Sequence, residues 1–269
     1  RCSLFLKTKR TDHGKSNSMK RLLDFLIASF SLLVLSPLFA LVALLIWLQD
    51  LQSPFYVAPR VGKSGESFPL IKFRSMVVGA DRSGVDSTSA SDPRITRLGA
   101  VLRSSKLDEL PQLWNVLRGQ MSFVGPRPQV ERDVLLYTEK EQKLLTIQPG
   151  ITDLASIVFA DEGEILRDCS DPDLEYNRLI RPWKSRLGLI YVENQSLELD
   201  LRLFFLTALV LISWSWALKG VYKILRSLDA GETLIRVCKR KDPLVPYPPP
   251  GSSQIVVERT SKPPKPNSA

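Results

Sequence analysis

An adjacent pair of acids, Asp108-Glu109, is the feature of this sequence best suited to chemistry. Ser105 stands three residues before Asp108, the spacing of a helix capping box, so we expect the pair in the first turn of a helix. The positive pole of a helix N-terminus keeps a carboxylate ionised, and an ionised carboxylate can act as a nucleophile or bind a metal. Acids at this position also serve simply to stabilise the helix end, so the pattern leaves both interpretations open.

Two arginines flank the acidic pair. Arg103 lies just upstream, and Arg127 stands between two prolines that restrict its backbone. Guanidinium groups bind phosphate oxygens through paired hydrogen bonds, so acids and arginines together predict phosphoryl transfer with a hard divalent cation. The alternative for Pro126-Arg127-Pro128 is an ordinary rigid turn.

The composition of the 269-residue chain limits other kinds of chemistry. The chain has a single histidine, His13, and three cysteines without the short spacing of a zinc or redox motif, which disfavours histidine catalysis and a disulfide framework. The net charge of +9 suits nucleic acid, anionic membrane or phosphorylated ligands. Nucleic acid is disfavoured because the basic residues flank apolar segments and no aromatic-interleaved basic stretch occurs.

A helical repeat and two short strands must position these residues. Apolar residues recur at helical spacing over 107–117, and Gly119 is expected to end that helix. Upstream, the segments 55–61 and 68–76 predict two strands joined by a turn at Ser64-Gly65. The acidic pair, the arginines and the strands are therefore expected in one soluble domain.

A long apolar segment, 26–48, precedes the strands and carries Ser36-Pro37 near its centre. It is long enough to cross a bilayer, but basic residues flank both ends, whereas positive charge marks the cytoplasmic side alone. Proline breaks the helix there, and the serine hydroxyl can bond a freed carbonyl. The segment by itself leaves open a kinked span and a helix-break-helix that enters the bilayer and returns. A cleaved signal peptide is disfavoured because the run is too long.

The C-terminal third contains a second apolar run and a proline-rich end. The run, 203–218, is short for a span and is followed by basic residues, so we expect a helix in the membrane interface or packed against the first segment. Trp214 and Trp216 near its end would lie at the headgroup level. From Asp242 the composition predicts a disordered tail.

Four motifs occur in a specific order along the chain. They are KFRSM from Lys72, DPRITRLG from Asp92, LDELPQLWNVLRGQMSFVGPRP from Leu107 and PGIT from Pro149. Together they resemble the bacterial monotopic phosphoglycosyl transferases, the sugar transferases that begin polysaccharide and glycan assembly. The resemblance covers about 19–201. The chain departs from it at Asp153, where many members carry glycine.

The resemblance implies a reaction and its residues. Members transfer a sugar-1-phosphate from a nucleotide diphosphate sugar, usually a UDP-sugar, to polyprenyl (undecaprenyl) phosphate. By match, Asp108 attacks the β-phosphate, releases UMP and holds the sugar phosphate covalently, while Glu109 binds the required Mg²⁺. The residues implied to hold phosphate groups are Arg103, Arg127, Lys72 and Arg74.

The resemblance also implies a topology. Ser36-Pro37 matches the break of a re-entrant helix that contacts membrane lipid, which places the site on the cytoplasmic face of the bacterial inner membrane. We therefore predict an α+β, mostly helical fold, with a compact cytosolic catalytic domain on a re-entrant helix and a second apolar, interfacial helix. The predicted segments are a basic lead, the re-entrant helix, the catalytic domain, the apolar helix and a disordered tail, at 1–18, 19–50, 51–200, 201–228 and 229–269.

A non-catalytic membrane scaffold of the same fold is the alternative to a transferase. A scaffold has no use for the Asp108-Glu109 pair, which favours the enzyme. The sequence leaves open the sugar, the pathway and whether the chain forms a homo-oligomer.

Overall fold

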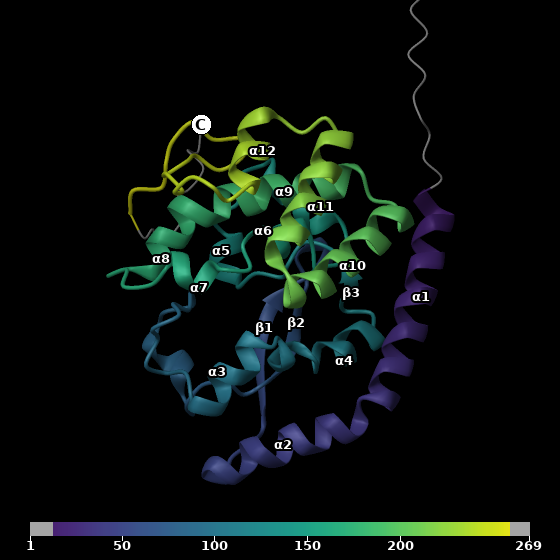
Figure 1. The fold of residues 1–269 in the computed structure, drawn as a ribbon, viewed down its shortest axis with the longest axis vertical. Coiled ribbons are helices and arrows are strands. Elements are labelled where there is room, and N and C mark those ends of the chain that lie inside the picture. Colours follow the sequence, from purple (N-terminus) through teal and green to yellow (C-terminus); the bar gives the residue numbers. More distant parts are fainter. Residues whose placement is uncertain (1–12, 259–269) are drawn as a thin grey trace, which may run out of the picture.

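The computed structural model describes the backbone of residues 13–258 and the side chains of residues 18–258. The fold is α+β and mostly helical, as predicted, with two two-stranded sheets. Figure 1 shows helices α1 (His13–Val34) and α2 (Ser36–Asp50) as an elbow along one side and the bottom of the molecule, with the other elements inside it. Of the predicted basic lead, residues 1–12 lie outside the described part of the chain, and the rest belongs to α1.

The apolar segment is broken where Ser36-Pro37 predicted a break. The two helices are bent by 63° relative to each other. Pro37 stands in the first turn of α2, where its missing N–H leaves no hydrogen bond unmade, and the Ser36 hydroxyl donates to the Leu33 carbonyl at 2.8 Å. Among the described helices, none is long and apolar enough by itself to cross a membrane, whereas the bent pair passes that test of length and composition.

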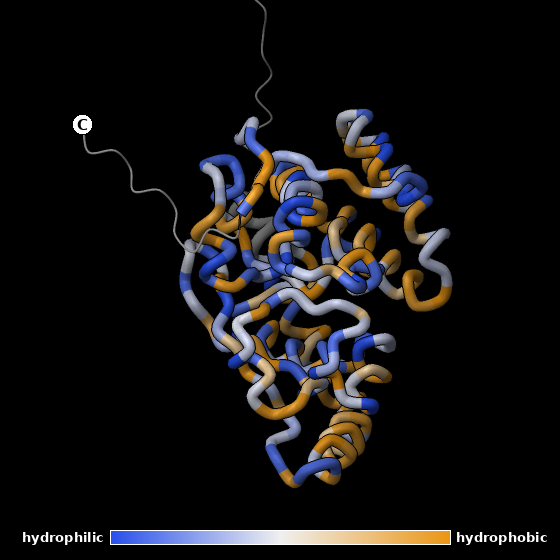
Figure 2. The backbone as a smooth tube through the Cα atoms, turned by 90° about the vertical axis from the view of Figure 1, so that its left-hand side faces the viewer, coloured by the Kyte–Doolittle hydropathy of each residue, from blue (hydrophilic) through white to orange (hydrophobic). Residues whose placement is uncertain are grey.

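The outer surface of the elbow is apolar. Figure 2 shows hydrophobic residues gathered at the lower end of the molecule, where α2 lies. Close to the break, Leu33 is 74% exposed and Phe30 is 68% exposed. Further exposed apolar side chains of the two helices are Leu22, Leu26, Leu41, Leu44, Leu45 and Leu48. A continuous apolar surface of this kind marks a contact with lipid or with another protein.

Both ends of the elbow are fastened to the same body. Near the start of α1, the Lys20 ammonium donates to the Val124 carbonyl at 2.9 Å and to the Asp200 carboxylate at 2.5 Å. At the end of α2, the Asp50 carboxylate accepts from Arg74 at 2.6 Å. The start of α1 and the end of α2 are therefore both attached to the body of the fold.

Strands β1 (Phe55–Val61) and β2 (Ser67–Phe73) form an antiparallel ribbon. The first strand has the predicted bounds, whereas the second ends before Met76, which makes only an isolated bridge. The predicted turn between them is the short helix η1 (Lys63–Gly65). In Figure 1 the ribbon runs from α2 at the bottom toward the helices above.

The prediction of one continuous helix over 107–117 is wrong. The structure divides it into a 3₁₀ helix, η3 (Leu107–Glu109), and helix α4 (Gln112–Leu117). Pro111 lies between them and has no N–H to donate to the carbonyl four residues back, so the helix cannot continue through it. Gly119, with a φ angle of 81°, follows the end of α4 as predicted.

The predicted capping box between Ser105 and Asp108 is also wrong. The Ser105 hydroxyl donates to the Val101 carbonyl at 2.7 Å, so it closes the preceding helix, α3 (Arg97–Ser104). Helix η3 instead starts from Lys106, whose φ angle of 58° is in the left-handed region. Residues with a side chain adopt this conformation at a cost, often where a fold positions functional groups. A strained turn, rather than a capped helix, therefore places the acidic pair.

The helices above the ribbon share one hydrophobic core with a parallel second sheet. Its strands are β3 (Ser122–Val124) and β4 (Gly150–Thr152). Leu187 and Tyr191 of helix α9 (Arg181–Glu193) are fully buried in this core. The smaller helices of the fold are η2 (Ala80–Ser83), α5 (Glu131–Val134), η4 (Glu141–Thr146), α6 (Leu154–Val158), α7 (Glu162–Ile165), α8 (Pro172–Glu175) and η5 (Tyr176–Ile180).

The second apolar run is not the single helix predicted over 203–218. Ser213, in an extended conformation, divides it into α10 (Leu197–Ile212) and α11 (Trp214–Ser227), which pack on each other. The Trp214 indole donates to the carbonyl of Ile157 at 2.8 Å and so points into the body. Trp216 is 66% exposed, so only one of the two tryptophans is free to meet a headgroup layer.

The predicted disordered tail is wrong for residues 229–258. Helix α12 (Glu232–Cys238) packs on α11, and the proline-rich segment after it lies against α9. The Tyr247 ring lies 4.3 Å from the Trp183 ring, and Arg186 donates to the Pro248 carbonyl at 2.9 Å. A proline-rich chain needs no core of its own when aromatic side chains and carbonyl acceptors dock on a folded helix. Residues 259–269 lie outside the described part.

Candidate active site

Two separate elements bring charged side chains to Glu109. Arg127, in the loop after β3, donates from both terminal nitrogens to the Glu109 carboxylate, one of them at 3.0 Å. Lys72 of β2 donates to the same carboxylate at 3.3 Å. We call Lys72, Asp108, Glu109 and Arg127 the Glu109 cluster. The sequence placed all four in the site, and the structure brings them together.

A buried asparagine fixes Lys72 beside this carboxylate. Asn115 of α4 is fully buried; its side-chain oxygen accepts from the Ile71 N–H at 3.0 Å, and its amide group donates to the Pro69 carbonyl at 2.7 Å. These two bonds fasten β2 to the helix that follows the acidic pair. Asn115 was not predicted from the sequence, because an amide within an apolar helical repeat gives no local sign of its partner.

Arg127 is fixed by the close approach of two loops. Gly125 donates its N–H to the Thr152 carbonyl at 3.0 Å, and Gly150 donates to the Pro126 carbonyl at 3.0 Å. A Cβ atom at Gly150 would lie 2.1 Å from the Gly125 nitrogen, so a side chain there would force the two segments apart. The Pro126-Arg127-Pro128 segment is thus held by the second sheet as well as by its own prolines.

The charges in the cluster hold Glu109 ionised. Burial by itself would raise the pKa of Glu109, but Arg127 and Lys72 outweigh it and hold that pKa well below its usual range. The pKa of Arg127 is raised in turn, chiefly by Glu109. Burial lowers the pKa of Lys72, while Glu109 acts in the opposite direction. An acid with two cationic partners is a binding and organising group rather than a proton donor.

Asp108 has a different environment from its neighbour. It is 6% exposed, and no side chain among residues 18–258 forms an ion pair with it. Burial raises the pKa of Asp108, an effect that Lys72 opposes and the adjacent Glu109 reinforces. A buried carboxylate without a bound cation keeps its lone pairs available, which is the condition for a nucleophile.

The two remaining arginines of the sequence prediction differ in position. Arg103, in the last turn of α3, is half-buried, and its charge is one of those that lower the pKa of Asp108. Arg74 lies apart from the cluster: it pairs with Asp50, and its Nε donates to the Ser53 carbonyl at 2.8 Å. The structure therefore gives Arg74 the role of anchoring the end of α2.

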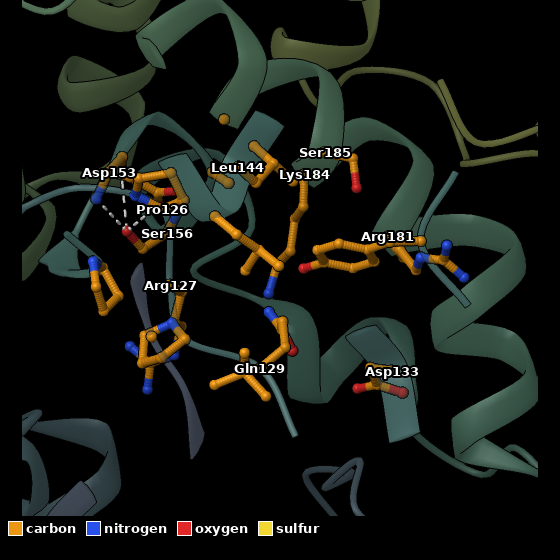
Figure 3. Close-up of a pocket in the computed structure, with 18 of the residues that line it drawn as sticks. Pro126, Arg127, Gln129, Asp133, Leu144, Asp153, Ser156, Arg181, Lys184 and Ser185 are labelled. Atoms are coloured by element: carbon orange, nitrogen blue, oxygen red, sulfur yellow. Dashed lines mark hydrogen bonds between the residues drawn. The ribbon is translucent and has the colours of Figure 1, made fainter. Parts of the chain in front are cut away.

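A small cavity adjoins Arg127, and neither Asp108 nor Glu109 lines it. Its lining includes both apolar side chains and polar ones, among them Gln129, Asp133 and Lys184, as Figure 3 shows. Asp153, where the chain departs from the family pattern, also lines this cavity. Its carboxylate accepts from the Ser156 N–H at 2.7 Å and so caps helix α6, which explains the aspartate by local structure.

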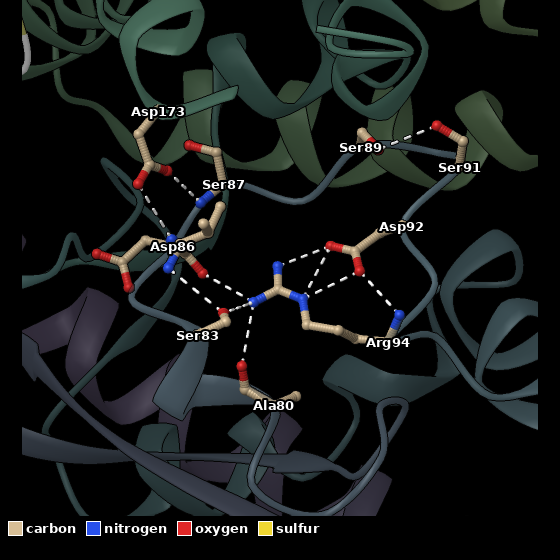
Figure 4. Close-up of polar contacts among 10 residues, drawn as sticks. Ala80, Ser83, Asp86, Ser87, Ser89, Ser91, Asp92, Arg94 and Asp173 are labelled. Atoms are coloured by element: carbon tan, nitrogen blue, oxygen red, sulfur yellow. Dashed lines mark hydrogen bonds and ion pairs between the residues drawn. The ribbon is translucent and has the colours of Figure 1, made fainter. Parts of the chain in front are cut away.

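The DPR part of the second motif builds a loop rather than the cluster. Figure 4 shows Arg94 at the centre of the loop over 79–94, paired with Asp92 and donating to the Ala80 carbonyl at 3.1 Å and the Val85 carbonyl at 3.0 Å. Asp173 of α8 accepts from the Ser87 N–H at 2.7 Å and so attaches the loop to the upper helices. The charged residues of this motif thus serve the fold.

Known proteins are similar to this chain over most of its length. The model of the bacterial sugar transferase family matches residues 15–214. The chain belongs to the bacterial sugar transferase family. The matched range includes the elbow and the whole Glu109 cluster of this sugar transferase, but not α12 or the docked proline-rich segment.

Three relatives of this sugar transferase illustrate the range of the family. The chain is 38% identical over 203 residues to the exopolysaccharide production protein ExoY of Sinorhizobium fredii, covering 70% of this chain and 83% of that one. It is 38% identical over 195 residues to the undecaprenyl-phosphate glucose phosphotransferase of Komagataeibacter xylinus, covering 70% of this chain and 35% of that one. It is 34% identical over 199 residues to the UDP-glucose:undecaprenyl-phosphate glucose-1-phosphate transferase of Klebsiella pneumoniae, covering 72% of this chain and 40% of that one.

Proposed function

We propose that this sugar transferase moves a sugar-1-phosphate from a UDP-sugar to undecaprenyl phosphate, as the first membrane step in the synthesis of a glycan or exopolysaccharide. The observation that carries the proposal is the unpaired, buried Asp108 beside a Glu109 that is held by Lys72 and Arg127. The names of the relatives support the acceptor and, for the Klebsiella pneumoniae protein, the UDP-sugar donor.

The chemistry then divides into two displacements at one phosphorus atom. In the first, an Asp108 carboxylate oxygen attacks the β-phosphorus of the donor, and UMP leaves with the electrons of the broken P–O bond. In the second, a phosphate oxygen of undecaprenyl phosphate attacks the same phosphorus, and the Asp108 carboxylate leaves. The product is an undecaprenyl diphosphate sugar, and the two substrates never need to be bound at the same time.

The cations of the cluster supply the charge stabilisation. Lys72 and Arg127 already converge on one anionic group, so a phosphate that enters between them and Glu109 meets two preorganised donors. Arg103, close enough to affect the pKa of Asp108, would contact the same phosphate from the α3 side. Because negative charge spreads over the phosphoryl oxygens in the transition state, these contacts strengthen as the reaction proceeds.

The acidic pair also fits a Mg²⁺ ion. No group of three or more His, Cys, Asp or Glu side chains within the described residues could enclose a metal, but Mg²⁺ commonly binds through one or two carboxylates, water and substrate phosphates. Glu109 would hold the ion, and the bound ion would neutralise phosphate charge. Glu109 is kept ionised for this purpose by the same cations that hold the phosphates.

We infer that the elbow enters one leaflet and returns, which places the cluster near the headgroup layer on the cytoplasmic face. Cysteines at Met19, which is exposed near the start of α1, and at Ser64, which is exposed at the ribbon tip, should then react with an impermeant maleimide from the same side of sealed vesicles. The measurement uses a variant without native cysteines. A cysteine at Leu33, beside the break, is the control and should be protected from both sides. Labelling of the first two positions from opposite sides would show a span.

The reaction is tested by UMP release from a panel of UDP-sugars, with and without undecaprenyl phosphate and Mg²⁺. We expect turnover with one donor that depends on both the lipid and the metal. The purified full chain should be shown to be folded by circular dichroism in the same preparation. Folded protein that releases no UMP from any donor would contradict the proposed reaction and favour a non-catalytic membrane scaffold.

A further inference from the structure

The β1-β2 ribbon carries a basic residue that the reaction above does not use. Arg60 lies on β1, one residue before the end of the strand, and is half-buried. Tyr56 is opposite Lys72 in the ribbon, and alternate residues of a strand point to the same side. Tyr56, Arg60 and Lys72 therefore share one face of the ribbon, the face that meets Glu109.

Arg60 lacks an anionic partner of its own. Within residues 18–258 no carboxylate forms an ion pair with it, and its guanidinium makes a single long hydrogen bond, 3.4 Å to the Pro59 carbonyl. Burial lowers its pKa, and the positive charge of Arg127 acts in the same direction. A half-buried guanidinium beside a second one is unfavourable unless an anion binds between or beside them.

No nearby carboxylate pairs with Arg60 within residues 18–258. Asp86, whose charge acts on Arg60, is already paired with Arg132. Asp133 also acts on Arg60; burial raises the pKa of Asp133 to about 6, so it is mostly ionised at pH 7, but it forms no ion pair with Arg60 within residues 18–258. Arg60 is therefore a half-buried basic group without a carboxylate partner within residues 18–258, and it is available for a ligand anion.

Lys72 and Arg60 lie at different distances along the ribbon from the elbow. Lys72 lies at the end near α2, whereas Arg60 is about 13 Å along the ribbon from Tyr56, the residue opposite Lys72. At that far end, the Val61 N–H donates to the Gln129 carbonyl at 2.9 Å, which joins the strand to the wall of the cavity beside Arg127. The apolar elbow suits a lipid, so a hydrophilic nucleotide is expected toward the end of the ribbon away from the elbow.

We propose that Arg60 binds the phosphate of the leaving nucleotide, so that the ribbon orders the two substrates: the lipid phosphate toward Lys72 and the nucleotide toward Arg60. This rests on the proposed function for the identity of the nucleotide. Arg60 forms no hydrogen bond or ion pair with Asp108 within residues 18–258, so its role would be in binding. The same phosphate chemistry could come from the lipid acceptor, and the test distinguishes these sources.

The first test is the affinity of the full-length protein for UDP, which requires no turnover. Loss of a charge-assisted contact to phosphate should weaken UDP binding by Arg60→Gln about 10- to 100-fold, and Arg60→Lys should restore part of it. Arg82→Gln, a matched change at an exposed arginine of η2, should bind UDP like the unaltered protein. Thermal unfolding of each variant checks that the fold is retained. Unchanged UDP affinity in folded Arg60→Gln, or no UDP binding by the unaltered protein, would overturn the proposal.

The second test assigns the phosphate to its source. In Arg60→Gln we expect the KM for the UDP-sugar to rise about 10-fold or more, while the KM for undecaprenyl phosphate stays within about twofold. The opposite pattern would place the lipid phosphate at Arg60 and contradict the proposed order. UDP binding by a protein that does not turn over would count against the proposed function but leave the Arg60 contact standing.

Discussion

Replacing Asp108 with asparagine should abolish turnover while making the protein more stable at neutral pH. Asparagine keeps the shape of the side chain but cannot form the bond to phosphorus, so UMP release should fall by at least about a thousandfold. Burial raises the pKa of Asp108, so the folded protein bears the cost of an ionised, buried carboxylate at pH 7. Asp108→Asn removes that cost and should raise the unfolding temperature.

The pH dependence of this stabilisation follows from the direction of the shift. A group whose pKa is raised on folding favours the folded state below its unfolded pKa and loses that contribution as the pH rises through the folded pKa. The stability difference between Asp108→Asn and the unaltered protein should therefore shrink as the pH falls toward the ordinary carboxyl pKa, about 3.9. Turnover within tenfold of the unaltered protein would remove Asp108 from the role of nucleophile. A lower unfolding temperature at pH 7 would contradict the electrostatic account.

Replacing the adjacent Glu109 with glutamine should also abolish turnover, but it should destabilise the protein. Arg127 and Lys72 would lose the carboxylate that they share, and breaking a largely buried ion pair from one side costs about 3 kcal/mol. The pKa of Glu109 lies well below its usual range, so its stabilising contribution is present above the unfolded pKa and is lost only in strong acid. The loss of stability in Glu109→Gln should therefore be complete at pH 7.

A matched control separates this effect from a general loss of charge. Glu193→Gln removes one negative charge at an exposed position at the end of α9 and should change neither turnover nor the unfolding temperature appreciably. Chemical denaturation at pH 7 measures all three variants. If Glu109→Gln and Asp108→Asn shift stability in the same direction, the assignment of opposite environments to two adjacent acids is wrong.

The sequence predicted those features that depend on local chemistry. Pro37 broke the apolar segment and Gly119 ended α4, because each acts through its own backbone. The predicted capping box does not form because the Ser105 hydroxyl donates to the Val101 carbonyl of the preceding helix. Residue spacing alone does not reveal this competing hydrogen bond. The docked tail failed for a similar reason: Tyr247 is held by Trp183, which lies 64 positions away in the sequence (247 − 183).

For the site, too, the sequence predicted individual residues but not the contacts between distant elements. Motif order selected Lys72, Glu109 and Arg127, and the structure brings them together. It gave no means of telling Lys72 from Arg74, which lies just after the end of β2 and pairs with Asp50. Asn115 and Arg60 were missed because their roles come from pairing between α4, β1 and β2 rather than from a pattern within any one of them.

The most direct test of the central claim is the mass of the intact protein after mixing with the UDP-sugar that supports turnover, in the absence of undecaprenyl phosphate. The protein should gain the mass of one sugar phosphate, peptide mapping should place it on Asp108, and adding the lipid should remove it. Asp108→Asn should gain nothing. Turnover without any adduct on rapid quenching, or an adduct on another residue, would contradict a covalent mechanism through Asp108.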